Sequence, residues 1–332
     1  MGIFGFGREG GGHEAPPEVT AEVGETKEEG KEYGHNVHVE VDFDRHYDPD
    51  KDEMGKSLDR LSRKGHEDKR EAGANLPEGM KTKVYASEMK RAQQSAQEVA
   101  FVETEVEDIV DDKDANIINQ RLTAELKKKL VDRGYDPKKL DRRSFKFLAR
   151  IKKALNPLKF GAEYQKKCFI KNSEAPKEEW KKRSYNEVVQ YWLDNPDETG
   201  ETTNPLEAAS ALAYRLDTCM KMAERLYDNS NVLLKHKTHG PNPDALLREI
   251  MINEDGSVGF ESVEDIGGAV TPGEGIKFVI DIDEQGKATK KLKFRDKLYD
   301  YSEQRFEELV DTYAEKNGKK KRYEKVTADS SK

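Results

Sequence analysis

The sequence predicts an α/β protein with a mostly parallel sheet that carries helices on both faces. Short runs in which apolar residues alternate with polar ones are interspersed along the chain with longer runs of helical periodicity. An order of strand, helix, strand, helix is typical of a parallel sheet whose crossover helices cover both faces. No internal repeat of 20–50 residues is visible, so a solenoid or propeller is not expected.

The first elements follow from local patterns near the start of this alternation. Residues 37–43 alternate apolar and polar side chains, which predicts a strand. A helix is expected over 61–76, and a short strand over 83–87 leads directly into a helix over 87–102. The sequence EVEDIV at 105–110 is a further strand candidate.

The middle of the chain is expected to be mostly helical. Helices are predicted over 119–131 and over 145–155, the second ending before Pro157. A third covers 184–193, where Ser184 and Glu187 have the spacing of a capping box. Pro205 suits the first turn of a long fourth helix.

The C-terminal third returns to alternating strands and helices. A strand over 231–238 is followed by a helix with Pro243 at its start. The segments 276–283 and 288–294 predict a hairpin around the turn Glu284-Gln285-Gly286, and a last helix is expected over 302–316.

The amino-acid composition limits the classes of protein to which this chain can belong. Of the 332 residues, 34% are apolar and 37% charged, against roughly 45–50% and 25% in ordinary domains. We therefore expect a thin core and long solvated stretches. A membrane protein is excluded because no run approaches about 20 apolar residues, and two cysteines cannot build a secreted disulfide scaffold. The N-terminus lacks a signal peptide, so the expected compartment is the cytoplasm.

These features divide the chain into three parts. Residues 1–34 are rich in Gly and Glu and are expected to form a disordered leader. Residues 35–316 form the α/β domain, in which about 135–195 are expected to be a basic helical insert or cap. Residues 317–332 are expected to be a disordered basic and polar tail.

Unusual polar residues stand where three of the expected strands end. The first strand ends in Arg45-His46, the second leads to Ser87 and Arg91, and a late strand ends in Thr238-His239-Gly240. Reactive groups of open α/β sheets gather at the carboxyl ends of the strands. Guanidinium forks bind phosphate oxygens, and imidazole is a nucleophile at neutral pH. The pattern therefore predicts an anion site with a nucleophile.

Four motifs in this order resemble the histidine phosphatase superfamily, also called phosphoglycerate-mutase-like, and are more similar to its first branch. The family's Arg-His-Gly corresponds to RHYDPD from Arg45, and its Leu-Thr-x-x-Gly motif to LSRKGHEDKREAG from Leu61. Its Ser-x-Leu-x-Arg-Ala motif corresponds to SEMKRAQQSA from Ser87, and its late Ser/Thr-His-Gly to THGPNPDALLREI from Thr238. Order and relative spacing agree over about residues 36–300.

The resemblance implies a role for each matching residue. His46 would take the phosphoryl group as a phosphohistidine, with Arg45, Arg91, His239 and Gly240 around the phosphate. The proton donor of this branch follows the third strand near an Arg-Leu-x-Glu sequence. The nearest match, offset by one residue, ends at Glu125. No metal and no cofactor are implied.

The resemblance also leaves alternatives open. Tyr47 replaces the family's Gly after the first His, and Asp48 and Asp50 follow. We expect a phosphatase acting on a phosphorylated small molecule or phosphoprotein. The alternative is an inactive relative that binds a phosphorylated ligand or a protein partner.

The segment Lys138–Arg183 is basic, with 16 Lys/Arg against five Asp/Glu, and suits anionic substrates. No nucleic-acid-binding module is recognisable in the sequence. We therefore do not expect nucleic acid as a partner, and the sequence predicts neither the substrate nor the oligomeric state.

Overall fold

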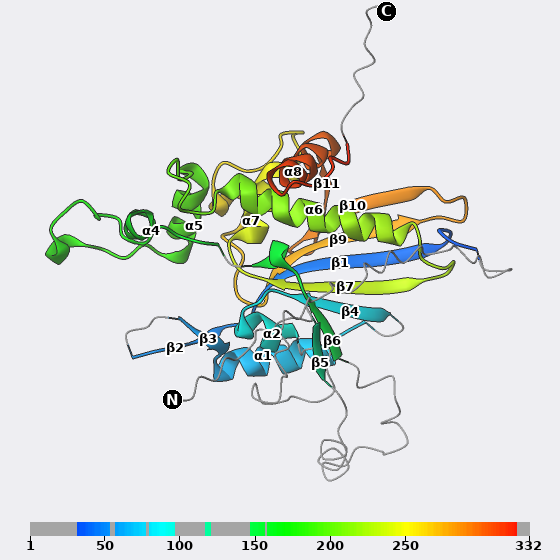
Figure 1. Ribbon diagram of the computed structural model, residues 1–332, viewed down its shortest axis with the longest axis horizontal. Coiled ribbons are helices and arrows are strands. Elements are labelled where there is room, and N and C mark those ends of the chain that lie inside the picture. The colour runs from blue at the N-terminus through cyan, green and yellow to red at the C-terminus, as the bar shows by residue number, and fades with distance from the viewer. Residues whose placement is uncertain are drawn as a thin grey trace, which may run out of the picture. The chain divides into compact units, whose positions relative to one another are not determined.

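A mixed sheet of nine strands organises the part of the chain that the structure describes (Figure 1). The computed structural model describes residues 32–53, 57–77, 80–96, 117–120, 147–156 and 158–323. The strand order is β5-β6-β4-β7-β1-β9-β10-β11-β8. The strands are β1 (Val37–Arg45), β4 (Lys81–Ala86), β5 (Ile117–Gln120), β6 (Phe147–Ile151), β7 (Asn231–Thr238), β8 (Met251–Ile252), β9 (Gly275–Ile282), β10 (Ala288–Phe294) and β11 (Lys297–Tyr301). A separate two-stranded sheet pairs β2 (Pro49–Lys51) with β3 (Ser57–Leu61).

The parallel part of the sheet consists of four adjacent strands. β6, β4, β7 and β1 pair in parallel, whereas β5 and all strands from β9 to β8 pair antiparallel with their neighbours. The predicted α/β class is confirmed, and the sheet is mixed because the hairpin β9-β10 extends it beyond β1. Among the described residues no helix is both long and apolar enough to cross a bilayer.

Helices lie on both sides of this sheet (Figure 1). On one side are α6, α7 and α8, and on the other are α1 and α2 next to β4. The helices are α1 (Arg63–Ala74), α2 (Lys90–Ala96), α4 (Ala162–Phe169), α5 (Tyr185–Asp194), α6 (Pro205–Ala223), α7 (Asn242–Ile250) and α8 (Glu303–Lys316). Short 3₁₀ turns are η3 (Lys153–Leu155), η4 (Lys177–Glu179) and η5 (Val263–Ile266).

The predicted caps start two of these helices. The Ser184 hydroxyl accepts the N–H of Glu187 while the Glu187 carboxylate accepts the N–H of Ser184, which confirms the capping box of α5. Asn204 caps α6, and Pro205 occupies its first turn as expected.

One predicted helix was wrong, and a second is contradicted at its first two residues and untested beyond them. Phe147–Ile151 forms β6, which pairs in parallel with β4, and the turn η3 follows it. Asn119 and Gln120 belong to β5, and the remainder of that predicted helix lies outside the described residues, as do 105–110. A short apolar run has no periodicity that separates strand from helix, so pairing with a neighbouring strand decides its state.

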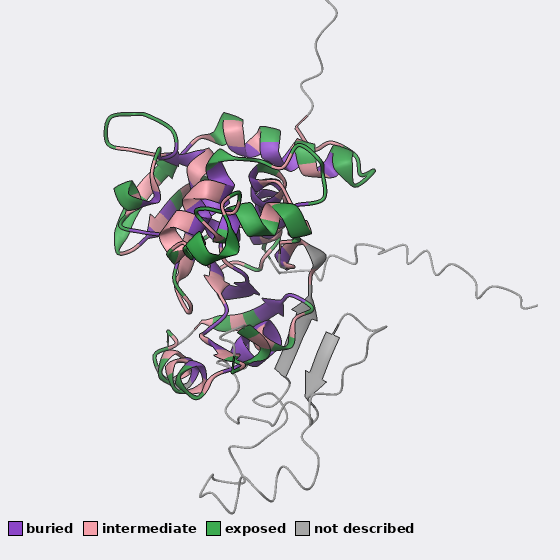
Figure 2. Ribbon diagram, turned by 90° about the vertical axis from the view of Figure 1, so that its left-hand side faces the viewer, coloured by how far each residue is buried: buried purple, intermediate pink, exposed green. Residues whose placement is uncertain are grey.

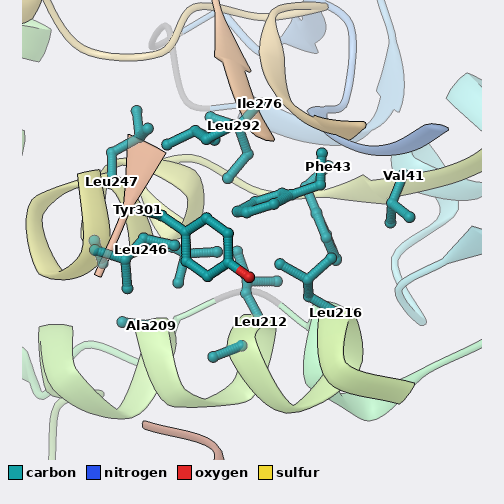
Figure 3. Packing of buried hydrophobic residues seen from close by; sticks show 14 of the residues in the cluster. Val41, Phe43, Ala209, Leu212, Leu216, Leu246, Leu247, Ile276, Leu292 and Tyr301 are labelled. Carbon is teal, nitrogen blue, oxygen red and sulfur yellow. The ribbon is translucent and has the colours of Figure 1, made fainter. Parts of the chain in front are cut away.

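The main core lies between the sheet and α6. Val41 and Phe43 of β1 point toward Leu212 and Leu216 of α6, and all four are 0% exposed (Figure 3). Buried residues gather in the sheet and on the inward sides of its helices, while the outward sides are exposed (Figure 2). Each such side chain stabilises the fold by about 1.5–3 kcal/mol relative to leaving it in water.

The opposite face of β1 carries charged residues in ion pairs. The Lys235 ammonium lies 3.2 Å from a carboxylate oxygen of both Asp42 and Asp44, and Lys237 lies 2.8 Å from Asp44. On the other flank Lys277 pairs with Glu40. Each acidic residue of β1 therefore faces a lysine of β7 or β9, which explains how a central strand accommodates alternate carboxylates.

The segment 317–323 is attached to the domain, although it was expected to begin the tail. The backbone N–H groups of Arg322 and Tyr323 donate to the Asp311 carboxylate. The Arg322 guanidinium and the Tyr323 hydroxyl both bind the buried Asp217 of α6. The expected leader up to residue 31 and the tail from residue 324 lie outside the described residues.

Candidate functional site

The three strand ends named in the sequence are neighbours in the sheet. β1, β7 and β4 are adjacent and parallel, and their register aligns Arg45 with Thr238 and Lys237 with Ala86. Backbone bonds continue this register past the strands. The N–H of His46 donates to the Thr238 carbonyl at 3.0 Å, and that of Ser87 donates to the Lys237 carbonyl at 3.2 Å. The residues that follow the strands therefore share one edge of the sheet.

His46 is buried and has a defined tautomer. The residue is only 4% exposed, and its Nδ1 atom lies 2.7 Å from the Tyr47 carbonyl oxygen. Because a carbonyl only accepts, Nδ1 carries the proton and Nε2 carries the lone pair. The ring of His239 stands edge-on to that of His46, with centroids 5.0 Å apart. Nε2 of His46 has no hydrogen bond from the described residues, so its lone pair is available.

His239 is held by the hydroxyl group of Ser87. The distance from Ser87 Oγ to His239 Nε2 is 2.6 Å, and both residues are at most 2% exposed. The same Oγ accepts the N–H of Met89 at 3.3 Å and keeps one lone pair and one proton, so either group of the Ser87–His239 pair can be the donor. Nδ1 of His239 is buried and has no hydrogen-bond partner in the described part of the chain.

The two arginines each retain an unpaired donor. Arg45 Nη1 donates to the Val270 carbonyl at 3.0 Å, and Arg91 Nη1 lies 3.4 Å from the Leu58 carbonyl. The Nε–H groups of both side chains are buried and have no partner within the described ranges. A buried donor left unpaired costs about 1–3 kcal/mol, so both groups are suited to an anion that would pair with them.

The electrostatics of the site are strongly positive. Burial and the nearby charges of Arg91, Arg45 and Lys237 together lower the pKa of His46 to about 3, against the opposing effect of the hydrogen bond to the Tyr47 carbonyl. Burial also lowers the pKa of His239 well below its ordinary value, with contributions from His46, Arg91 and Arg45. Both imidazoles are therefore neutral at pH 7, and the positive charge belongs to the guanidinium and ammonium groups. Such a site attracts a dianion.

A glycine is needed at position 240 because side-chain atoms of other residues approach it closely, not because of its backbone angles. A Cβ atom there would lie 2.9 Å from Arg45 Cδ and 3.0 Å from Arg45 Nε, and the Tyr185 hydroxyl would be closer still. The glycine therefore lets Arg45 and Tyr185 approach the loop after β7. This position was expected to bind phosphate, and the structure places it directly beside the Arg45 side chain.

The side chains of the residues after His46 make their contacts with groups other than the imidazole. Tyr47 is 5% exposed and packs beneath Lys237, whose Nζ lies 4.8 Å from the ring centroid. Asp48 accepts the Ser62 hydroxyl at 3.1 Å, and Asp50 pairs with Arg60 at 2.7 Å. The altered loop is thus anchored to the β2-β3 region.

The sequence did not single out three residues that contact or influence this site. Tyr185 stacks on Arg45, Asp244 holds the Val270 backbone, and Lys237 lowers the pKa of His46. Tyr185 and Val270 come from segments distant in sequence, and no local pattern identifies them. The position of Asp244 within the late Thr-His-Gly motif was the one available signal.

Glu125 lies outside the described residues, so the structure does not test it as the proton donor. Within the described ranges, the group of three residues close enough to share an ion is Glu32, His35 and Asp228. It lies near the start of β1, whereas the candidate site lies where β1 ends.

Comparison with protein-family models and with curated proteins finds no match to this chain.

Proposed function

We propose that this protein is a phosphatase that hydrolyses a phosphomonoester through a phosphohistidine on His46. The observation that carries the proposal is the convergence of two neutral imidazoles and two guanidiniums at one edge of the sheet. The hydrogen bond from Nδ1 to the Tyr47 carbonyl leaves Nε2 of His46 as the nucleophilic atom. The substrate is a phosphorylated small molecule or a phosphoprotein.

The proposed reaction has two steps. In the first, the Nε2 lone pair of His46 attacks phosphorus, the ester P–O bond breaks, and the leaving alcohol oxygen takes a proton from a general acid. In the second, water attacks the phosphohistidine, the P–N bond breaks, and inorganic phosphate leaves with His46 regenerated. The acid returns to its protonated form by taking the proton of the attacking water.

The surrounding groups would stabilise charge on the transferred phosphoryl group. Arg45 and Arg91 supply unpaired Nε–H donors, and His239 supplies its unpaired Nδ1, which carries the ring proton when Ser87 donates to Nε2. Donors fixed before the reaction stabilise developing charge at little reorganisation cost, which accounts for most catalysis of phosphoryl transfer. These are the residues to which the resemblance to the histidine phosphatase superfamily assigns the same roles. Glu125 is proposed as the general acid on that resemblance alone.

A hydrolysis assay with p-nitrophenyl phosphate tests the proposal. The His46→Ala variant should lose about 10³-fold or more in kcat/KM, because it lacks the nucleophile. His38→Ala is the matched control, since His38 lies on β1, the strand that leads to His46, and pairs with Asp281 away from the site. Acid-labile phosphate trapped on the wild-type protein by rapid quenching should map to His46.

Two outcomes would contradict hydrolysis through His46. Unchanged turnover in His46→Ala would exclude His46 as the nucleophile. A folded wild-type protein that binds inorganic phosphate but neither turns over nor forms phosphohistidine would instead be the inactive, phosphate-binding relative.

A further inference from the structure

Groups from distant parts of the sequence hold the Arg45 side chain. Its guanidinium carbon lies 4.3 Å from the ring centroid of Tyr185, the first residue of α5. Its Nη1 donates to the carbonyl of Val270, in the loop between η5 and β9, at 3.0 Å. These two contacts leave the Nε–H group of Arg45 without a partner in the described part of the chain.

Asp244 holds the same loop from the other side. Its Oδ1 accepts the N–H of Val270 at 2.8 Å, so Val270 is bound by Asp244 through its N–H and binds Arg45 through its C=O. Asp244 is 0% exposed and lies in the first turn of α7, five residues after His239. Its Oδ2 is buried and has no partner among the described residues.

A buried carboxylate of this kind needs compensation by hydrogen bonds or by a positive charge. Burial raises the pKa of Asp244 to about 7, although the Val270 hydrogen bond and then the Arg45 charge both act against that rise. Tyr185 adds a rigid aromatic face against the guanidinium. Arg45 is therefore fixed before any anion arrives.

We infer that Asp244 is a positioning residue that holds Arg45 for phosphate through the Val270 backbone. The inference rests on the proposed function, because it takes Arg45 to be a phosphate ligand. A flexible arginine must lose rotamer freedom when it binds an anion, and a side chain fixed beforehand avoids that loss. Asp244 acts on phosphate affinity without touching phosphate.

Isothermal titration calorimetry with inorganic phosphate tests this role in a double-mutant cycle. The variants are Asp244→Ala, Arg45→Ala and the combination. We expect Asp244→Ala to weaken phosphate binding about 10-fold, and Arg45→Ala to weaken it at least as much. In the Arg45→Ala background the Asp244 substitution should have no further effect, because Asp244 acts on phosphate binding only through Arg45.

Two further variants separate positioning from folding. Asp244→Asn retains an oxygen that accepts the Val270 N–H, and should bind phosphate within about threefold of wild type. Asp265→Ala is the matched control, because Asp265 accepts the N–H of Ser262 in the preceding turn η5 without contacting Val270 or Arg45. It should leave the affinity unchanged. Thermal unfolding of each variant reports any loss of stability separately.

The outcomes distinguish this inference from the proposed function. Additive losses in the cycle, unchanged affinity in Asp244→Ala, or an equal loss in Asp244→Asn would overturn the positioning role while leaving phosphate binding intact. Failure of the wild-type protein to bind phosphate would overturn the proposed function and the positioning role together.

Discussion

Substitution of Gly240 by alanine tests how tightly the site is packed around Arg45. The new Cβ would stand 2.9 Å from Arg45 Cδ, against an ordinary contact distance of 3.4 Å or more. Arg45 would have to retreat by about 0.5 Å, and the Tyr185 hydroxyl by more, because it is the nearer atom. The Val270 carbonyl and the Tyr185 ring oppose that movement.

The substitution should weaken both folding and phosphate binding. Overpacking of this kind destabilises a protein by about 1–3 kcal/mol. Displacement of Arg45 removes a hydrogen bond to a charged group, worth about 1.5–3 kcal/mol, which corresponds to about 10- to 150-fold in affinity. Calorimetric titration with inorganic phosphate measures the affinity, and urea unfolding measures the stability.

Two comparisons make the Gly240 result specific. Gly256→Ala is the control, because Gly256 has φ near +83° and no atom within 4 Å of an added Cβ. It should lose about 1 kcal/mol of stability and retain full affinity. Adding Tyr185→Phe to Gly240→Ala removes the nearest clashing atom and should restore part of the affinity. Wild-type phosphate affinity in Gly240→Ala would refute the packing described around Arg45.

Two further predictions concern the buried histidines. Ser87→Ala removes the hydrogen bond to His239 and should weaken phosphate binding about 3- to 10-fold in the same titration; unchanged affinity would exclude Ser87 as a support for that ring. The free energy of unfolding should fall from pH 7 to pH 5, since the unfolded chain protonates imidazoles that the folded protein keeps neutral. These imidazoles are His46, His236 and His239. Asp42 and Asp244, whose raised pKa values are about 6 and about 7, bind protons at a higher pH in the folded protein than in the unfolded chain. These two protons offset about two of the three that the imidazoles bind on unfolding. The net slope in urea titrations therefore grows from near zero at pH 7 to about 1.4 kcal/mol per pH unit at pH 5, and a rise in stability as the pH falls over this range would contradict it.

Local sequence patterns were sufficient where short-range physics decides the structure. The alternation over 37–43 predicted β1, and the spacing of Ser184 and Glu187 predicted the start of α5. The topology rule for strand ends then predicted that His46, Arg91 and His239 lie near one another. The ring centroids of His46 and His239 are 5.0 Å apart, and the Arg91 charge lowers the pKa of both imidazoles. These predictions needed no knowledge of the complete chain path.

Long-range pairing accounts for what the sequence did not predict. The apolar residues of Phe147–Ile151 suit a helix as well as a strand, and the pairing of this segment with β4 makes it a strand. The wall around Arg45 combines Tyr185, Asp244 and Val270, which are separated from it by about 140 to 225 residues. No local periodicity encodes such contacts.

A crystal structure of the protein soaked in orthovanadate tests the central claim most directly. Vanadate imitates the trigonal bipyramidal geometry of phosphoryl transfer, so it should bond to the Nε2 atom of His46 with Arg45, Arg91 and His239 around its equatorial oxygens. Vanadate absent from this edge of the sheet, or bound there without contact to His46, would contradict phosphoryl transfer through that imidazole.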